Sequence, residues 1–364
     1  MTGTLESFDA VADGAQVLDD VLSILTRYVI FPSAEAADAA TLYAAATHAQ
    51  TAWEHATRLL VKSPEKRCGK SRLLEILREL VSLPRPTVNI SAAALVRSIH
   101  PENPPVLIVD EADRLYGSKV KTEANEDLTA ILDAGFARGW PYTRYNAARS
   151  MTEDFPTFCM AMLATKGVTL PDTIEDRSVI ISMRRKAPGE EVASFRRRDV
   201  PELNDLRDLL HAWVAGCADE LAKAEPEMPV DDRAADCWEP LCAIADAAGD
   251  SWPGRARQAC LVLTGTAEQT GVADGVRLLA DLRTIFGDAD ARSTEQILIA
   301  LLKVDESPWG DVDGKPINAY GLSERLRPYG IRPRVVRIGE STPRGYRRAD
   351  LHESWTRYLP DVVT

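Results

Sequence analysis

The spacing of apolar residues predicts where this chain is helical and where it is extended. From Leu18 to Val29, apolar residues recur at the spacing of a buried helix face, and Phe31-Pro32 ends the pattern. Ser33 can cap a second, alanine-rich helix that continues to about residue 50. Residues 1–50 are therefore expected to form an N-terminal helical segment.

Short β-favouring runs follow, with helical stretches between them. The runs are 59–61, 87–90, 106–109, 158–163 and 179–183. Each run is apolar on both faces, which is typical of strands in a parallel sheet that helices cover on both sides. The pattern predicts an α/β domain over residues 51–190.

The remainder of the chain shows two further patterns. A basic linker at 185–200 leads to helical stretches at 203–222, 232–248 and 254–263, which define a helical domain at 191–270. Residues 271–364 begin with helices at 293–303 and 319–326, followed by strand-like runs at 334–338 and 345–348 and a last helix. Two helices followed by a β-hairpin predict a winged-helix-like domain.

Composition and charge limit the classes of protein. With 364 residues and 45% hydrophobic content, the chain can form about two to four packed units. The net charge of -12 means that any nucleic-acid surface must be a local basic patch. The six cysteines contain no Cys-x-x-Cys pair, which favours reduced core thiols in a cytoplasmic protein. No apolar run approaches the roughly 18 residues of a membrane span, so we expect no membrane partner.

A loop after the first strand carries a phosphate-binding pattern. In such a loop, backbone N–H groups and the helix N-terminus surround the phosphates, a lysine reaches the β- and γ-oxygens, and a hydroxyl binds Mg²⁺. Pro64 stands where the pattern normally has its first glycine, and a capped helix start is the alternative for Gly-Lys-Ser taken alone. The predicted contacts to ATP are Arg67, Cys68, Gly69, Lys70, Ser71 and Arg72.

Two adjacent carboxylates end the buried run 106–109. Asp110 is the candidate Mg²⁺ ligand, together with Ser71, and Glu111 is the candidate base that polarises the attacking water. Solvated acids are the alternative, but two adjacent carboxylates at the end of a buried strand would otherwise carry a desolvation cost. The pair strengthens the prediction of an ATPase with ATP and Mg²⁺ as ligands.

Two more residues fit an ATPase of the AAA+ type. Thr165 ends the strand beside the acidic pair, where AAA+ proteins place the sensor that orients the lytic water, although threonine commonly ends strands. Arg177 precedes the last strand and is the candidate arginine finger, which acts on the γ-phosphate bound by a neighbouring subunit. An internal ion pair with Glu175 or Asp176 is the alternative.

With these motifs, the chain resembles a P-loop family of actinobacterial phages, prophages and plasmids that is described as a domain of unknown function and is fused to primase modules in some members. The resemblance is carried by residues 63–72, 107–113, 170–181, 232–241 and 327–333, together with Gly345-Tyr346-Arg347. It implies an AAA+ type P-loop domain with a helical lid, in a helicase-like ATPase of a mobile element. Any priming activity would have to come from another chain.

The resemblance also implies a role for Arg233, at the start of the helix 232–248. In an AAA+ lid, a second sensor arginine at this place reaches back to the nucleotide. An ion pair with Asp231 or Asp236 is the alternative.

A cluster of arginines in the last domain reverses the local charge. Eight of them face a single acid, Glu340, between residues 325 and 348: Arg325, Arg327, Arg332, Arg334, Arg337, Arg344, Arg347 and Arg348. A recognition helix at 319–326 and a wing at 339–345 would present these arginines to DNA phosphates, while Tyr346 could stack or pack. A solvated basic face or a docking surface for an acidic protein is the alternative.

Three functions remain open. The first is a ring-forming DNA helicase or translocase, a homo-oligomer such as a hexamer that works with a primase or another replication protein. The second is an ATP-switched DNA-binding adaptor, such as a helicase loader or an origin-binding protein, and the third is an ATP-dependent regulator or phage-defence sensor that acts on protein. The stretch 140–146, with Tyr142, Arg144 and Tyr145, is either a pore loop toward single-stranded DNA or an ordinary surface hairpin.

Overall fold

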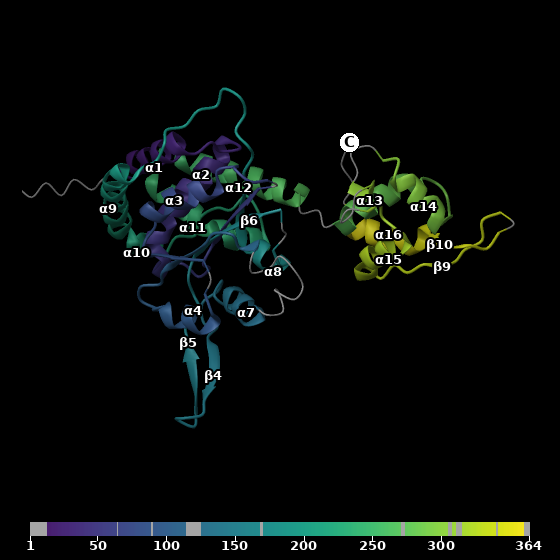
Figure 1. The fold of residues 1–364 in the computed structure, drawn as a ribbon, viewed down its shortest axis with the longest axis horizontal. Helices are drawn as coiled ribbons and strands as arrows, with labels where there is room; N and C mark the ends of the chain where they lie inside the picture. Colours follow the sequence, from purple (N-terminus) through teal and green to yellow (C-terminus); the bar gives the residue numbers. More distant parts are fainter. Residues whose placement is uncertain are drawn as a thin grey trace, which may run out of the picture. The chain divides into compact units, whose positions relative to one another are not determined.

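The computed structural model describes residues 13–63, 65–88, 90–113, 125–167, 170–270, 274–304, 308–310, 315–339 and 341–359. The chain divides into two compact units, Met1–Gly265 and Thr266–Thr364 (Figure 1). The buried apolar residues form two clusters in the first unit and a third cluster in the second unit.

A five-stranded sheet organises the first unit. Its strands, in spatial order, are β2 (Pro84–Thr87), β3 (Val106–Val109), β6 (Ala161–Lys166), β1 (Arg58–Ser63) and β7 (Ser178–Ser182). Every neighbouring pair is parallel. The prediction of a mixed α/β fold with a parallel central sheet is therefore confirmed, and the C-terminal ends of all five strands lie at one edge.

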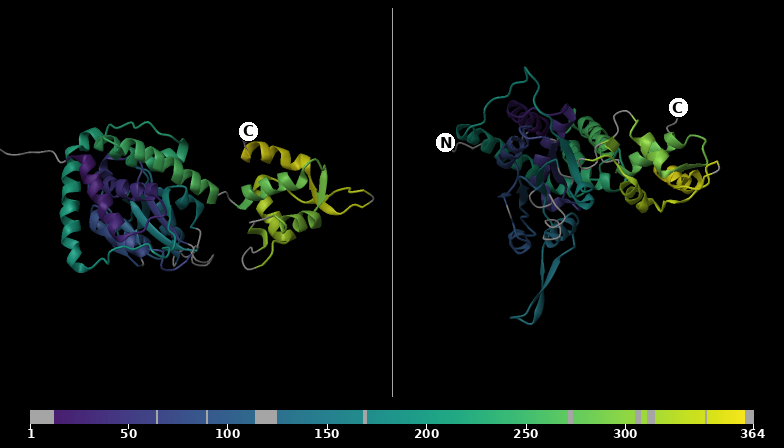
Figure 2. Two further views of the ribbon diagram at one scale, coloured as in Figure 1. Left: turned by 90° about the horizontal axis from the view of Figure 1, so that it is seen from above. Right: turned by 45° about the vertical axis from the view of Figure 1, so that its right-hand side comes forward.

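Alternate residues of the central strands face two different cores. Leu59 and Val61 of β1 belong to one cluster, whereas Leu60 belongs to the other. In β6, Met162 belongs to the same cluster as Leu59, and Leu163 belongs to the same cluster as Leu60. Because helices cover both faces of the sheet (Figure 2), both sets of side chains are removed from water, and the strands are apolar throughout.

Helices from both ends of the first unit supply the two cores. The larger cluster draws on α1 (Gly14–Tyr28), α2 (Ala34–Ala46), α3 (Lys70–Leu80), α9 (Val200–Gly216), α10 (Ala218–Leu221), α11 (Asp232–Ala248) and α12 (Trp252–Thr270). The smaller cluster draws on α4 (Ala92–Ser98), α7 (Glu126–Ala134) and α8 (Asp172–Glu175). Short 3-10 helices occupy Thr47–Ala52 and Arg197–Asp199. The predicted cap at Ser33 is present, since its Oγ accepts the Ala36 N–H at 3.3 Å.

Two strands differ from their predicted limits. The run 87–90 was expected to be a strand, but β2 ends at Thr87 and contains Pro84 and Pro86. β2 is an edge strand in which the Leu83 carbonyl accepts the Val106 N–H at 3.1 Å, so the proline nitrogens alternate away from β3 and no ladder bond is lost. β6 starts at Ala161 rather than 158, because pairing with β1 and β3 sets its limits.

A buried arginine stabilises the edge of the sheet at which the strands begin, called the starting edge here. Arg58, at the first position of β1, is 2% exposed. Its guanidinium donates to the carbonyls of Ala56 and Leu132, each at 2.6 Å, and of Cys159 at 2.8 Å. These carbonyls lie in the segment before β1, in α7 and in the segment before β6. A buried guanidinium is tolerated only when its donors are satisfied, so this group ties three segments together.

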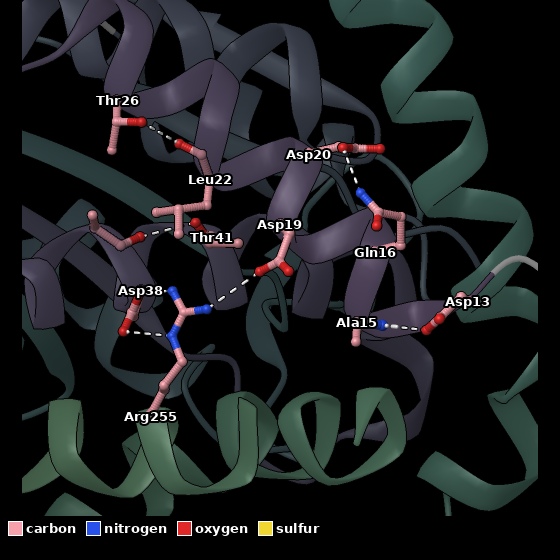
Figure 3. A network of polar contacts seen from close by, with 11 residues as sticks. Asp13, Ala15, Gln16, Asp19, Asp20, Leu22, Thr26, Asp38, Thr41 and Arg255 are labelled. Atoms are coloured by element: carbon pink, nitrogen blue, oxygen red, sulfur yellow. Dashed lines mark hydrogen bonds and ion pairs between the residues drawn. The ribbon is translucent and has the colours of Figure 1, made fainter. Parts of the chain in front are cut away.

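The N-terminal helical pair is joined to α12 by a second arginine (Figure 3). Arg255 bonds to Asp38 of α2 through Nε, at 3.1 Å, and Nη2, while its Nη1 lies 3.3 Å from Asp19 of α1. The guanidinium also lies 3.8 Å from the centroid of the Trp252 ring. Because the Asp38 side chain is buried, this ion pair fixes α1 and α2 to the end of the helical domain.

A hairpin formed by β4 (Tyr142–Asn146) and β5 (Met151–Phe155) projects from the first unit (Figures 1 and 2). Arg144 forms an ion pair with Asp127 of α7, and Arg97 of α4 lies 5.2 Å from the Phe155 ring centroid. Trp140 and Tyr145 are 68% and 66% exposed. The stretch 140–146 is thus part of an arm that is anchored at its base and carries exposed aromatic rings.

The second unit is built from helices around a small antiparallel sheet. The helices are α13 (Asp274–Phe286), α14 (Thr294–Leu301), α15 (Ala319–Leu326) and α16 (Arg348–Tyr358), with 3-10 turns at Pro308–Gly310 and Arg327–Tyr329. The strands pair in the order β8 (Ala291–Ser293), β10 (Arg344–Arg347), β9 (Arg334–Val335). The two predicted helices and the hairpin after them are present. Tyr346 packs into the core of this unit and is 1% exposed.

The cysteines are free thiols. Burial raises the pKa of the Cys159 thiol to about 11 and that of the Cys237 and Cys242 thiols to about 12, so these groups stay protonated at neutral pH. In the described part of the chain, no helix combines the length and the apolar character that crossing a membrane requires.

Replacing Arg58 with Met should destabilise the starting edge of the sheet. The three carbonyls lose their shared donor while they remain buried, so we expect a loss of about 3 kcal/mol or more in local stability. Hydrogen exchange of peptides from β1, β6 and α7 measures it. Arg78→Met on the exposed side of α3 is the matched control and should change stability by less than about 0.5 kcal/mol. Unchanged protection in Arg58→Met would show that the buried guanidinium does not hold these segments.

Candidate functional site

The loop between β1 and α3 contains two residues in the left-handed conformation. Gly69 caps α3 with a φ of +84°, and Arg67 has a φ of +66°. Left-handed residues among right-handed ones orient successive N–H groups into a concave nest that can bind an anion. A Cβ at Gly69 would lie 3.4 Å from Met183 Cε, an ordinary contact, so the backbone conformation rather than space requires glycine. Pro64 lies outside the described residues.

Lys70 lies at the C-terminal end of β1. Its Nζ donates to Ser63 Oγ at 2.5 Å, and Ser63 Oγ donates to the Glu65 carbonyl at 2.7 Å. The half-buried ammonium is therefore held beside the loop by a hydroxyl of the strand that precedes it. A phosphate oxygen could replace this single neutral partner with a charged one.

Other predicted loop residues have different surroundings. Cys68 is buried, 4% exposed, whereas Arg67 is exposed. Arg72 forms an ion pair with Glu75 at 2.9 Å, and its guanidinium lies 5.6 Å from the Phe195 ring centroid. The Arg72 side chain is therefore engaged on the flank of α3, and only its backbone belongs to the loop.

The acidic pair follows directly after β3. Asp110 is half-buried and accepts the Glu111 N–H through Oδ1 at 2.9 Å. Glu111 is exposed and has a φ of +60°, a conformation that costs a non-glycine residue roughly 1–3 kcal/mol. The next residue restores pairing, since the Ala112 N–H donates to the Ala164 carbonyl at 2.7 Å. The turn therefore places two adjacent carboxylates at the end of the strand.

Thr165 lies on β6, the strand between β1 and β3. β6 pairs with both β1 and β3, and the register places Thr165 opposite Lys62 of β1. The side chain is 1% exposed. The sheet thus brings Ser63, Thr165 and Asp110 to the C-terminal ends of three adjacent strands.

A pocket of about 280 Å³ opens beside this edge. Ser71 from α3, Thr87 from β2 and Asp110 from β3 are among the residues that line it. A hydroxyl and a carboxylate facing one pocket are the hard oxygen donors that Mg²⁺ prefers, and Mg²⁺ needs only one or two protein ligands when phosphates supply the rest. The residues therefore fit the predicted metal. Within the described ranges, no group of three or more His, Cys, Asp or Glu side chains is arranged to hold a metal ion on its own.

Arg177 lies at the opposite edge of the sheet. Its carbonyl accepts the Arg58 N–H at 3.3 Å, at the start of β1, and its Nη1 donates to the Thr173 carbonyl at 2.6 Å. Its guanidinium lies 5.8 Å from the centroid of the Phe136 ring. Glu175, which the sequence offered as an ion-pair partner, is instead 2.5 Å from Lys62 Nζ.

Arg233 does not reach the phosphate loop of its own subunit either. Its Nη1 lies 3.5 Å from Asp236, one of the alternatives that the sequence left open, and its guanidinium lies 5.4 Å from the Phe136 ring centroid. The Phe136 carbonyl accepts the Ala56 N–H at 2.7 Å, before the start of β1. The structure therefore places Arg233 beside Arg177 and away from Lys70.

The pair formed by Lys62 and Glu175 was missed from the sequence. Glu175 also accepts the Leu170 N–H at 2.9 Å, so one carboxylate fixes the segment before β7 against β1. The two side chains are far apart in the chain, and no local pattern marks them as partners.

In the second unit, the predicted basic patch separates into paired and exposed arginines. Arg327 pairs with Glu324 at 3.2 Å, Arg334 with Asp350 at 3.0 Å and Arg348 with Asp288 at 3.5 Å. Arg325 is partly buried on α15, and its Nη1 lies 3.4 Å from the Gly321 carbonyl. Arg332, Arg337, Arg344 and Arg347 are exposed.

The hairpin of the second unit positions two of these exposed side chains. Arg344 and Arg347 are the first and last residues of β10, and the two residues between them are buried. A Cβ at Gly345 would lie 2.1 Å from the Arg292 carbonyl oxygen, so only glycine permits the close approach of β8. The ribbon continues beyond β9 through the pairing of Ile338 with Ser341, and Glu340 lies outside the described residues.

Parts of this chain match a known family and a known protein. Residues 182–358 match a family described as "Protein of unknown function (DUF3631)". An "uncharacterized 28.9 kDa protein in xis 5′ region" from Saccharopolyspora erythraea is 44% identical over 183 residues, which cover 50% of this chain and 70% of that protein.

Among solved structures, the A-form apo structure of the NrS-1 C-terminal region matches 91% of this chain and 75% of that chain, with a TM-score of 0.42 and 12% identity. A second structure of that region matches 91% and 74%, with a TM-score of 0.39 and 12% identity. The family match and the 44% identical relative establish the assignment. The chain belongs to the DUF3631 family.

Proposed function

We propose that this chain is a ring-forming ATPase of the AAA+ type that uses ATP hydrolysis to unwind or move along DNA during replication of a phage or another mobile element. The observation that carries the proposal is the meeting of the Lys70 loop, Asp110 and Thr165 at one edge of the parallel sheet, with Ser71 and Asp110 on one pocket. Three separate stretches of sequence supply these groups.

The proposed roles follow from the chemistry of each group. The phosphates would lie at the N-terminus of α3, where Lys70 exchanges Ser63 Oγ for the β- and γ-oxygens. Mg²⁺, when bound, would neutralise charge on those oxygens, with Ser71 and Asp110 holding it. Glu111 would accept a proton from water as the water oxygen bonds to the γ-phosphorus and the bond to ADP breaks, and Thr165 would orient that water.

A neighbouring subunit would complete the site. Arg177 lies at the other edge of the sheet from Lys70, so it can act only on a nucleotide bound by another copy. This placement supports the role of an arginine finger and an assembly in which each copy gives one edge and receives the other. A head-to-tail contact of this kind closes into a ring when its rotation allows.

Two surfaces support the proposed action on DNA. The exposed arginines of the hairpin in the second unit offer phosphate contacts, and α15 precedes them as a recognition helix would. In the first unit, the β4–β5 arm carries Trp140 and Tyr145 as exposed rings on which unpaired bases can stack.

Glu111→Gln should abolish hydrolysis and preserve ATP binding. Loss of the general base lowers the rate by about 100-fold or more, while the charge that Asp110 contributes to the metal remains. The measurement is ATPase rate with single-stranded, double-stranded and forked DNA, beside binding of a fluorescent ATP analogue. Lys70→Ala should lose both binding and hydrolysis.

Glu102→Gln, an exposed carboxylate before the same strand, is the control and should leave the rate unchanged. Full activity of Glu111→Gln would remove the proposed mechanism. Slow turnover without strand displacement in the unaltered protein would instead favour the ATP-switched adaptor.

Arg344→Gln should weaken DNA binding and reduce its dependence on salt. Each lost phosphate contact lowers the slope of log affinity against log salt concentration by about 1. Fluorescence anisotropy of labelled DNA across a salt series measures both quantities. Arg327→Gln is the matched control, because the Arg327 charge is already paired with Glu324. Equal effects of the two substitutions would argue against the hairpin as the DNA contact, and no effect on function would favour a regulator that acts on protein.

A further inference from the structure

One aromatic ring supports two arginines at the starting edge of the sheet. Phe136 is 1% exposed, and the guanidinium carbons of Arg177 and Arg233 lie 5.8 and 5.4 Å from its centroid. His55 stacks on the same ring, with a centroid distance of 5.0 Å. These residues come from four separate segments of the chain. A ring holds a guanidinium in place without neutralising its charge, so the cluster fixes two cations beside each other.

Neither arginine can serve the nucleotide site of its own subunit. β1 runs six residues from Arg58 to Ser63. The Arg58 N–H donates a hydrogen bond to the Arg177 carbonyl, and Ser63 Oγ accepts one from Lys70 Nζ. At about 3.3 Å per residue, the two edges are about 17 Å apart, more than an arginine side chain can span. Phe136 is bonded to Ala56, which lies further still from Ser63.

The two guanidinium groups keep the capacity to bind an anion. Arg177 uses a hydrogen bond to the Thr173 carbonyl, and Arg233 is 3.5 Å from Asp236, the outer limit of a hydrogen bond. Asp236 is shared, because His55 Nδ1 lies 3.8 Å from it. Each guanidinium has five N–H donors, so most donors of the pair are not used by these contacts. A triphosphate carries several negative charges and would compete well with one shared carboxylate.

We infer that Arg177 and Arg233 form one phosphate-binding pair that acts on the nucleotide of a neighbouring copy. This inference rests on the proposed function and changes the assignment of Arg233: it acts between subunits rather than within its own. The segment before β7 supplies one arginine and α11 supplies the other. Binding of ATP at the interface would therefore pull on both the sheet and the helical domain of the adjacent copy.

Mixing two inactive variants distinguishes the two modes of action. Lys70→Ala lacks a working phosphate loop but keeps both arginines, whereas Arg233→Gln keeps its loop and lacks one arginine. Alone, Arg233→Gln should lose ATPase activity by about 100-fold, as when one transition-state donor is removed. In a one-to-one mixture, a head-to-tail ring has complete sites at about a quarter of its interfaces, so about a quarter of the unaltered rate should return. If Arg233 acts within its own subunit, no complete site forms and no activity returns.

The same mixture with Arg177→Gln provides the comparison. Recovery in both mixtures supports the paired site, and recovery with Arg177→Gln alone overturns the assignment of Arg233. Full activity of Arg233→Gln by itself also overturns it. An unaltered protein without ATPase activity would remove the proposed function itself, which separates the two failures.

Two further measurements serve as controls for the Arg233 variants. Arg233→Gln should melt at the same temperature as the unaltered protein, because the Arg233 side chain is 46% exposed and its ion pair with Asp236 lies at the surface. Arg233→Lys keeps the charge and should retain more activity than Arg233→Gln while it gives the same mixing result. A lower melting temperature of both variants would indicate that Arg233 supports the fold of its own subunit and would overturn the inference.

Discussion

The placement of β6 between β1 and β3 is the constraint on which the rest of this structure depends. Because β6 pairs with both neighbours, the Lys70 loop and the acidic pair follow two strands that end at the same edge of the sheet, with one strand between them. Strands lie about 4.8 Å apart, so the ends of β1 and β3 are separated by about 10 Å. This gap is wide enough for a phosphate group and its metal ion. Lys70 Nζ donates to Ser63 Oγ and Asp110 Oδ1 accepts the Glu111 N–H, so each side chain has a hydrogen-bond partner beside its own strand.

The same parallel arrangement places the two proposed halves of the ATP site at opposite ends of the strands. At the starting edge, the Arg58 guanidinium satisfies three carbonyls and holds their segments together, while the buried Phe136 ring lies beneath Arg177 and Arg233. At the other edge, where the strands end, the loops carry Lys70 and the acidic pair Asp110 and Glu111. In the proposed assembly, a copy with its loops at one edge and its arginines at the other would meet the next copy head to tail. This polarity makes a ring the simplest closed assembly of the proposed ATPase.

Local sequence was sufficient where neighbouring residues determine the outcome. The runs that are apolar on both faces predicted the parallel sheet. Gly-Lys-Ser lies at the start of α3, in the connection after β1, and Asp-Glu follows β3, as their positions in the sequence required. Local sequence failed where tertiary contacts decide. Nothing near Arg233 indicates that Phe136 lies beneath it, and Lys62 and Glu175 meet only because β1 and β7 are adjacent. Counting charges between residues 325 and 348 also missed Asp288 and Asp350, which lie outside that window and pair with two of its arginines.

Six non-glycine residues in the described part of the chain have a positive φ, and three of them lie in or beside the proposed sites. Arg67 and Glu111 are left-handed residues without the freedom of glycine, and Asp232, just before Arg233, is a third. Such conformations persist only when the surroundings fix them. For Glu111, the bond from Ala112 to Ala164 and the bond from its own N–H to Asp110 supply that fixation. Because these bonds fix the backbone from which the Glu111 side chain extends, less ordering of this turn is needed when a substrate binds.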